Sequence, residues 1–374
     1  MPVRIAIDGR SLEGNRYSEA RYTLNLLNHF VKLKTGHEFI VYLSDEVEVP
    51  VLPASNLILR ILRGGGRPGA WESFRLPRAM LRDRVSLLFS PSGLLPAFNP
   101  CPMVATLRDL SAVAHPQWFA PGTRTVRRDR FRGNPARADR LVALSSFSKD
   151  EAIRLLGASG SRITVIHEAA DPVFRPVADR SCLDETRKKH RLESSFILTA
   201  GSIHPRKNHQ RLIEAVAMAG RFLGTTPMLL VAGPAPGRGA GTDIMELARS
   251  AGIQGRVKHV GHVPDRELML LYNACGFFIY PSVYESFGLP LVEAMACGAP
   301  SACSRTASLP EIAGDAVAYF DPHDTADIAS VITKLMSDET ARMDLSALGI
   351  RRASAFSWEK AATETIGLFE QLDG

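Results

Sequence analysis

Short apolar runs alternate with helical patterns along the chain, and this alternation constrains the fold more than any other feature. Apolar strands separated by helices favour a parallel sheet with right-handed crossovers. Residues 1–170 are therefore predicted to form one doubly wound domain. Its expected strands are Val3–Asp8, Glu38–Leu43, Leu57–Leu62, Ser86–Phe89, Met103–Leu107, Leu141–Leu144 and Arg162–Ile166, with helices over Ala20–Lys34, Thr123–Ala136 and from a capping box at Ser148-Lys149-Asp150-Glu151 to Leu156.

The alternation starts again after residue 170, and 374 residues are long for one core, so two domains are expected. We predict an α/β fold of two Rossmann-like doubly wound domains, 1–170 and 171–356, facing each other across a cleft. Residues 357–374 should form a C-terminal helix that crosses back to the first domain. The expected elements of the second half are Phe196–Gly201, Asn208–Ala219, Met228–Ala232, Asp243–Ala251, Val257–Val260, Asp265–Ala274 with Asp265 as N-cap, Cys275–Ser282, and helices from Thr325, Glu339 and Trp358.

Two carboxylates flank a Gly-Pro turn directly after the strand expected at Cys275–Ser282. A helix beginning at Pro290 would place Glu285 on the loop and Glu293 in the first helical turn. Glu293 and Lys207 are expected at an open cleft rather than in a core. Such loops lie at the carboxyl edge of a parallel sheet, where α/β proteins bind ligands, and a helix N-terminus favours anions. A sugar phosphate suits this geometry. The alternative is a solvated loop charge and a carboxylate that complements the helix dipole.

A basic turn follows the first strand of the second half. Arg206 and Lys207 stand at the N-terminus of the helix expected from Asn208. Cations at that end oppose the helix dipole, so their placement indicates an anionic ligand, with a solvated basic turn as the alternative. No D-x-D motif occurs in a strand-end loop, and we interpret Asp321 and Asp324 as a helix start. No metal site is predicted.

Charge is unevenly distributed between the two halves. Residues 1–170 carry 24 Lys and Arg against 15 Asp and Glu, a net +9, whereas residues 171–374 carry 21 against 24, a net −3. Nucleic acid fits the sign, but no aromatic-studded basic sheet, recognition helix or zinc finger is found. An anionic membrane surface or a lipid-diphosphate acceptor fits better. The densest basic cluster consists of Arg124, Arg127, Arg128, Arg130, Arg132, Arg137 and Arg140.

The sequence shows neither the features of a targeting signal nor those of a disulfide framework. No stretch of 18 apolar residues occurs and the N-terminus lacks the features of a signal peptide, so we expect a cytoplasmic protein that can bind the inner face of the membrane peripherally. Five cysteines without a C-x-x-C pair indicate buried, reduced thiols. The stretch Gly64–Gly69 satisfies G-x-G-x-x-G, but Pro68 blocks a helix start there, which favours a surface loop over a dinucleotide site.

The segment from Tyr280 to Phe320 resembles the large retaining glycosyltransferase family GT4. It carries E-x7-E at Glu285 and Glu293, then Cys297-Gly298-Ala299-Pro300 and Ser308-Leu309-Pro310-Glu311. The likeness extends over nearly the whole chain. It implies the GT-B arrangement, with an acceptor-binding first domain, a nucleotide-sugar-binding second domain, and no cofactor beyond the nucleotide-sugar donor.

The resemblance also assigns roles to residues of the second domain. It implies that Glu293 binds the ribose hydroxyls, and that Glu285 binds the sugar hydroxyls and diphosphate together with the backbone N–H groups of Phe287, Gly288 and Leu289. Arg206 and Lys207 are similar to the family's diphosphate clamp. The nucleobase is expected near Gly261 and His262.

The first domain departs from the family pattern at two places. The loop from Gly14, expected to approach the donor phosphate, reads Ser18-Glu19-Ala20 where the family has Gly-Ile-Gly. Arg108 replaces the family's His before Asp109. Arginine cannot act as a general base because its pKa is above about 12. We expect Arg108 to stabilise charge while the donor phosphate takes the acceptor proton; alternatively, Arg108 pairs with Asp109 or Glu19 and the site is inert.

Four segments look most like those of bacterial mannosyltransferases of surface polysaccharide synthesis: Asp109–Ser111, His115–Phe119, Ser145–Ser148 and Ser308–Glu311. This resemblance implies GDP-mannose as donor, with UDP- or dTDP-sugars as alternatives, and a glycan or lipid-diphosphate acceptor. Three other classes of protein share parts of this pattern. A glycoside hydrolase needs two carboxylates about 5–5.5 Å apart across the bond, a non-catalytic binding protein would keep only the donor pocket, and a sugar-nucleotide epimerase shares the two-domain plan.

Overall fold

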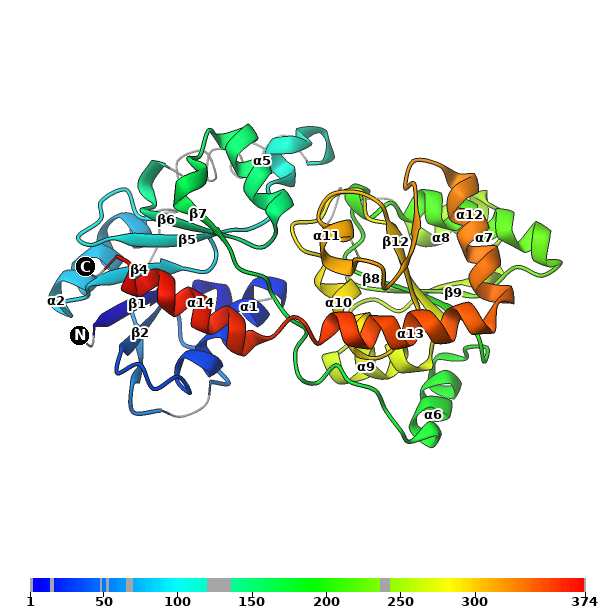
Figure 1. Cartoon of the computed structure of the whole chain (residues 1–374), viewed down its shortest axis with the longest axis horizontal. Helices are drawn as coiled ribbons and strands as arrows, with labels where there is room; N and C mark the ends of the chain where they lie inside the picture. The colour runs from blue at the N-terminus through cyan, green and yellow to red at the C-terminus, as the bar shows by residue number, and fades with distance from the viewer. Residues whose placement is uncertain are drawn as a thin grey trace. The chain divides into compact units, whose positions relative to one another are not determined.

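The computed structural model describes residues 3–13, 17–47, 49–51, 54–64, 70–119, 136–235 and 243–372. Backbone contacts divide the chain into two units (Figure 1). The first unit holds the described residues of 1–116, 121–168 and 357–374, and the second holds those of 117–120 and 169–356.

The first unit contains a seven-stranded parallel sheet in the order β3-β2-β1-β4-β5-β6-β7. Its order reverses between β1 and β4, as in a doubly wound fold. The inner strands of this sheet are almost wholly buried, which fits their nearly continuous apolar sequences, whereas the edge strands β3 and β7 are partly exposed. They are β1 (Arg4–Asp8), β2 (Glu38–Leu43), β3 (Leu57–Ile61), β4 (Leu87–Ser90), β5 (Met103–Leu107), β6 (Arg140–Ala143) and β7 (Ile163–Val165).

The C-terminal helix α14 (Trp358–Glu370) packs in the first unit against α1 (Tyr17–Phe30). Phe369 meets Phe30 edge-on with ring centroids 6.0 Å apart. Aromatic burial of this kind stabilises the attachment of the helix. The other described helices of this unit are α2 (Leu76–Arg82), which continues a π-helical stretch Trp71–Arg75, α3 (Ser111–Ala114) and α5 (Ser146–Leu156).

The second unit contains a six-stranded parallel sheet in the order β10-β9-β8-β11-β12-β13. The order reverses between β8 and β11, so the loops after these two strands leave the sheet side by side. The strands are β8 (Ile197–Ala200), β9 (Leu229–Ala232), β10 (Val257–His259), β11 (Phe277–Tyr280), β12 (Ser301–Ser304) and β13 (Ala318–Phe320). The helices are α6 (Arg180–His190), α7 (His209–Leu223), α8 (Ile244–Ser250), α9 (Asp265–Ala274), α10 (Leu289–Ala296), α11 (Leu309–Ala313), α12 (Thr325–Ser337) and α13 (Glu339–Ala353).

The two doubly wound sheets confirm the predicted α/β class, while several local predictions are wrong. The N-cap of α5 is Ser145, whose side chain accepts from the Ser148 N–H, and not a capping box at Ser148. Pro264, not Asp265, is the N-cap of α9. Helix α6 escaped sequence analysis because its only buried residues are Leu183 and Thr186, so it has no apolar stripe.

Other expectations meet the limits of the described residues. The helix expected at Thr123–Ala136 and the glycine patch Gly64–Gly69 lie almost entirely outside them. No helix among the described residues is long and apolar enough to cross a membrane. All five cysteines are free thiols, but only Cys297 and Cys303 are buried, which corrects the expectation for Cys101, Cys182 and Cys275.

Candidate functional site

The strand order of the second unit brings the two predicted charged loops together. β8 and β11 pair in parallel, with Ile197 and Leu198 in register with Phe277 and Phe278. The turn that carries Arg206 and Lys207 follows β8, and the loop that carries Glu285 follows β11. The Val283 N–H donates to the Arg206 carbonyl at 2.8 Å and ties the two loops to each other.

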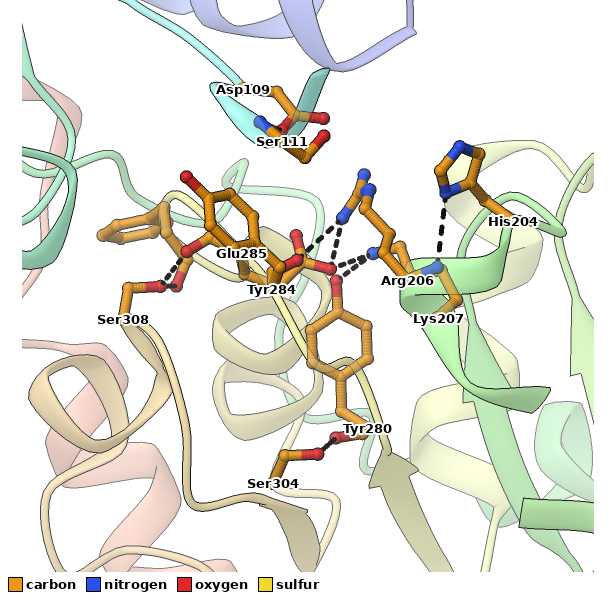
Figure 2. A network of polar contacts seen from close by, with 11 residues as sticks. Asp109, Ser111, His204, Arg206, Lys207, Tyr280, Tyr284, Glu285, Ser304 and Ser308 are labelled. Carbon is orange, nitrogen blue, oxygen red and sulfur yellow. Dashed lines mark hydrogen bonds and ion pairs between the residues drawn. The ribbon is translucent and has the colours of Figure 1, made fainter. Parts of the chain in front are cut away.

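Glu285 accepts hydrogen bonds from both cations (Figure 2). Its Oε1 lies 2.5 Å from the Lys207 ammonium and 2.6 Å from an Arg206 guanidinium nitrogen. All three side chains are largely buried. Burial alone would raise the pKa of Glu285, but the charges of Arg206 and Lys207 outweigh it and lower the pKa to about 2. The carboxylate is therefore ionised at neutral pH, and two cations beside one carboxylate leave the cluster with a net charge of +1.

Tyr280, the last residue of β11, is a part of this cluster that sequence analysis missed. The Lys207 ammonium donates to the Tyr280 hydroxyl and lies 4.5 Å from the centroid of its ring. Burial, followed by the charge of Glu285, raises the pKa of Tyr280, so the phenol stays neutral. The ring and hydroxyl of Tyr280 thus hold the buried ammonium next to Glu285. Nothing in the sequence marks Tyr280 except its place at the end of a strand.

Ser308 holds the loop between β11 and α10 in place. Its hydroxyl bonds the carbonyl oxygens of Glu285 and Phe287 at 2.9 and 3.0 Å. Gly288 then adopts φ 102°, and a Cβ there would lie 2.7 Å from a methyl carbon of Leu309. Only glycine fits both requirements. This turn brings the backbone N–H groups of Phe287, Gly288 and Leu289 to the N-terminus of α10, where an anion is favoured.

Glu293 differs from expectation in position and exposure. Helix α10 begins at Leu289, so Glu293 lies in the second turn and not in the first. Its side chain is only 1 % exposed, and Lys207 is 5 % exposed, which corrects the expectation that both stand at an open cleft. The Tyr272 hydroxyl donates to Glu293 at 3.5 Å. A carboxylate buried to this degree either bonds polar groups of the protein interior or binds a ligand that reaches into it.

The remaining predicted residues of the second unit lie at the same edge of the sheet. Gly261 follows β10, and its carbonyl accepts from the Gly233 N–H, after β9, at 2.7 Å. A Cβ at Gly261 would have no neighbour within 4 Å among the described residues, and His262 is exposed. His209 begins α7 nearby; burial, then the charges of Lys207 and His259, lower its pKa to about 3.

In the first unit, Arg108 is buried and has a partner that sequence analysis missed. Its guanidinium donates to Glu168 at 2.8 Å and lies 4.9 Å from the centroid of the Tyr22 ring. Burial raises the pKa of Glu168, and the charge of Arg108 opposes this. Asp109 accepts from the Ser111 N–H at 2.9 Å and so shapes the turn into α3. Gly14 lies outside the described residues.

No group of three or more His, Cys, Asp or Glu side chains arranged to hold a metal ion occurs in the part of the chain that the structure describes. Asp321 and Asp324 behave as a helix start. Asp324 is the N-cap of α12, and its side chain accepts from the N–H groups of Ala326 and Asp327.

Two doubly wound parallel sheets, with an ionic cluster at the carboxyl edge of the second, are the architecture of GT-B glycosyltransferases, and the comparisons with known proteins agree. Residues 184–352 match the family model described as "Glycosyl transferases group 1", and residues 20–174 match "Glycosyltransferase Family 4". The chain belongs to this family and is a glycosyltransferase, as the resemblance in its sequence predicted.

Among characterised relatives, the "O-antigen chain mannosyltransferase B" of Escherichia coli is 31% identical over 369 residues, which cover 94% of this chain and 95% of the relative. The "Serotype-specific mannosyltransferase WbdA" of Escherichia coli is 36% identical over 241 residues, which cover 63% of this chain but 29% of that larger protein.

Solved structures show the same fold. Sucrose-phosphate synthase from Thermosynechococcus elongatus superposes with a TM-score of 0.76 at 21% identity and covers 99% of both chains. Anabaena HepE in complex with UDP-glucose gives a TM-score of 0.77 at 15% identity over 99% of this chain and 100% of HepE. At these identities the likeness concerns the fold alone.

Proposed function

We propose that the chain is a retaining mannosyltransferase that uses GDP-mannose and extends a glycan or lipid-linked acceptor in surface polysaccharide synthesis. The single observation that carries the donor half of this proposal is the buried Arg206–Lys207–Glu285 cluster. The full-length similarity to an O-antigen mannosyltransferase supports the sugar and the process.

The cluster suits a diphosphate leaving group. The two cations are held in position before the donor binds, because Glu285 bonds both of them and Tyr280 bonds Lys207. The cluster with its net charge of +1 is therefore preorganised. When the bond between the anomeric carbon and the diphosphate oxygen breaks, negative charge grows on that oxygen. Preorganised cations stabilise such charge, and the loss of one donor from such a site typically costs roughly 10²–10³ in rate.

The neighbouring groups would bind the rest of the donor. In this proposal, Glu285 and the N–H groups of Phe287 to Leu289 contact the sugar and diphosphate. Glu293 accepts hydrogen bonds from the ribose hydroxyls, and its burial fits a ligand group that comes to lie inside the protein. The nucleobase lies near Gly261 and His262. Among the described residues, no atom lies within 4 Å of where a Cβ on Gly261 would stand, which supports this placement.

Retention requires no basic side chain in this scheme. Arg108 cannot accept a proton, and its charge is already paired with Glu168. The acceptor hydroxyl therefore attacks the anomeric carbon from the face that the diphosphate leaves, and its proton passes to the departing phosphate oxygen. One C–O bond forms, one breaks, and GDP leaves with the proton.

The buried Arg108–Glu168 pair also favours a second candidate, a nucleotide-sugar-binding protein without turnover. Donor turnover by the natural protein and by Arg108→His separates the two. We expect the natural protein to turn over the donor. Activity that is found only in Arg108→His would instead make the natural protein a binder.

The donor is tested by a thermal-shift panel of GDP, UDP, ADP and dTDP, because a bound nucleotide raises the unfolding temperature by mass action. GDP should give the largest rise. A larger rise with UDP or dTDP would mean that the donor carries that nucleotide in place of GDP, and no rise with any nucleotide would contradict the proposed site. Turnover of GDP-mannose with a soluble mannoside acceptor then tests the sugar.

We also propose that the protein works at an anionic membrane surface, as the charge of its first half indicated. The basic cluster that motivated this idea is described only at Arg137 and Arg140, since residues 120–135 lie outside the described part of the chain.

A further inference from the structure

Helix α13 packs beside α10, the helix whose N-terminus follows the donor loop, residues 285–289 (Figure 1). The Ser346 hydroxyl donates to the Gly298 carbonyl at 2.6 Å, just beyond the C-terminal end of α10. Further along α13, a Cβ on Gly349 would lie 3.3 Å from Cγ of Met295, so glycine allows the two helices this close approach. The C-terminal end of α13 therefore points back along α10 toward the donor loop.

Phe356, three residues beyond the end of α13, reaches the donor loop itself. Its ring meets the ring of Phe287 edge-on, with centroids 5.6 Å apart and an angle of 84° between the ring planes. Phe287 is buried, so this contact belongs to a packed interior. Edge-to-face aromatic pairs prefer one geometry, so the ring of Phe356 helps to fix where Phe287 lies.

Arg352, in the last turn of α13, connects the same ring to the second support of the loop. Its guanidinium lies 5.0 Å from the centroid of the Phe356 ring. It also donates to the carbonyl oxygens of Glu311 and Ile312 at 2.6 and 2.7 Å, near the C-terminal end of α11, where arginine can bond otherwise unsatisfied carbonyl groups. Ser308, whose hydroxyl holds the donor loop, is the N-cap of this α11. One arginine thus joins both supports of the loop.

We propose that Phe356, braced by Arg352, is a positioning residue for the donor loop and keeps the backbone N–H groups of residues 287–289 aimed at the diphosphate. Phe356 acts through Phe287 and does not touch the donor in this assignment. A displacement of about 1 Å in such a site can cost roughly 100-fold in rate, so a ring outside the site can matter for turnover. The inference rests on the proposed donor site, but it leaves the base and the sugar open.

This role differs from a general contribution to the fold in which ligands it affects. The donor loop is proposed to bind the diphosphate, whereas the base and ribose are assigned to Gly261, His262 and Glu293. A ring that positions residues 287–289 therefore affects ligands that carry a diphosphate. A ring that only stabilised the second unit would affect the diphosphate and the nucleoside equally.

The test compares, by calorimetry, the nucleoside diphosphate that gives the largest thermal shift with its nucleoside, GDP and guanosine in the proposal above. Phe356→Leu keeps an apolar side chain and removes the ring. It should weaken binding of the diphosphate about tenfold and leave that of the nucleoside within about twofold. Phe356→Tyr keeps the ring and should restore the affinity. The matched control is Tyr319→Leu, which removes a ring that also lies beside an arginine, 4.9 Å from Arg305, and it should bind both ligands naturally.

Turnover gives a second measurement. The N–H groups of the donor loop act mainly on the charge that grows on the departing diphosphate, so their misplacement affects the transition state more than the bound donor. With the soluble acceptor, Phe356→Leu should therefore lower kcat about 10- to 100-fold and raise KM for the donor less than this. Phe356→Tyr should recover most of the lost kcat.

Hydrogen exchange of the free protein tests the support of the loop without any nucleotide. The N–H groups of Leu291 and Val292 donate to the Gly288 carbonyl in the first turn of α10. A loosened donor loop opens this turn more often, so exchange at these two amides should be about tenfold faster in Phe356→Leu. It should be unchanged in Tyr319→Leu.

Three results would overturn the inference: natural affinity of Phe356→Leu for the diphosphate, an equal loss of diphosphate and nucleoside binding, or unchanged exchange at the start of α10. A natural protein that binds no nucleoside diphosphate would contradict the proposed donor site, and with it the role of Phe356 at the diphosphate. Faster exchange in Phe356→Leu would still show in that case that Phe356 holds the loop, so the two failures are distinguishable.

Discussion

Replacing Glu285 by Gln tests whether the ionic cluster is held by its one carboxylate. The change keeps the size of the side chain and removes the charge that Arg206 and Lys207 share. Lys207, which is 5 % exposed, would then be a buried ammonium without that counter-charge. We expect Glu285→Gln to lower the free energy of unfolding at neutral pH markedly.

The size of this loss follows from the pKa of Glu285. A fall from the ordinary 4.5 to about 2 means that the folded protein favours the ionised form. At about 1.4 kcal/mol per pH unit, this difference corresponds to about 3 kcal/mol. Because the folded pKa lies below the unfolded one, the contribution is complete above pH 4.5 and disappears as the pH falls toward 2.

Urea unfolding of the natural protein and of Glu285→Gln at neutral pH measures this loss. The control is Glu364→Gln, which removes the exposed pair with Lys360 on α14, and it should cost less than about 0.5 kcal/mol. GDP should restore part of the stability of Glu285→Gln, because its diphosphate supplies the missing negative charge. A loss no larger than that of the control would refute the reasoning.

Three further predictions concern other buried ionisable groups. Glu293→Gln should weaken nucleotide binding about 10- to 100-fold in calorimetry while it unfolds at nearly the natural urea concentration; unchanged affinity would remove Glu293 from the site. Arg108→Met should lower the free energy of unfolding by about 3–5 kcal/mol, and adding Glu168→Met should recover most of that loss. No recovery in the double variant would show that the two residues are not coupled. His209 stays neutral in the folded protein but takes up a proton in the unfolded chain, so stability should fall as the pH drops from 6.5 to about 5. His209→Gln should flatten this pH dependence in thermal melts. An unchanged pH dependence would mean that other groups take up the protons.

The sequence was sufficient to predict the two doubly wound sheets and the loops that carry the site. Buried strands such as Met103–Leu107 and Phe277–Tyr280 are nearly all apolar, and the helices between them carry capping residues, so both are visible locally. The carboxyl ends of parallel strands lie on one edge. Arg206, Lys207 and Glu285 could therefore be assigned to one site before their distances were known.

Only the tertiary structure decided which charges are buried and which partners they have. Arg108 and Glu168 are sixty residues apart, and no local pattern connects them. The contact between Lys207 and Tyr280 requires β8 to lie beside β11, which depends on how the whole sheet packs. The burial of Glu293 is likewise the sum of its neighbours in space. Strand and helix patterns depend on neighbouring residues in the chain, whereas burial and ion pairing depend on residues that only the completed fold brings together.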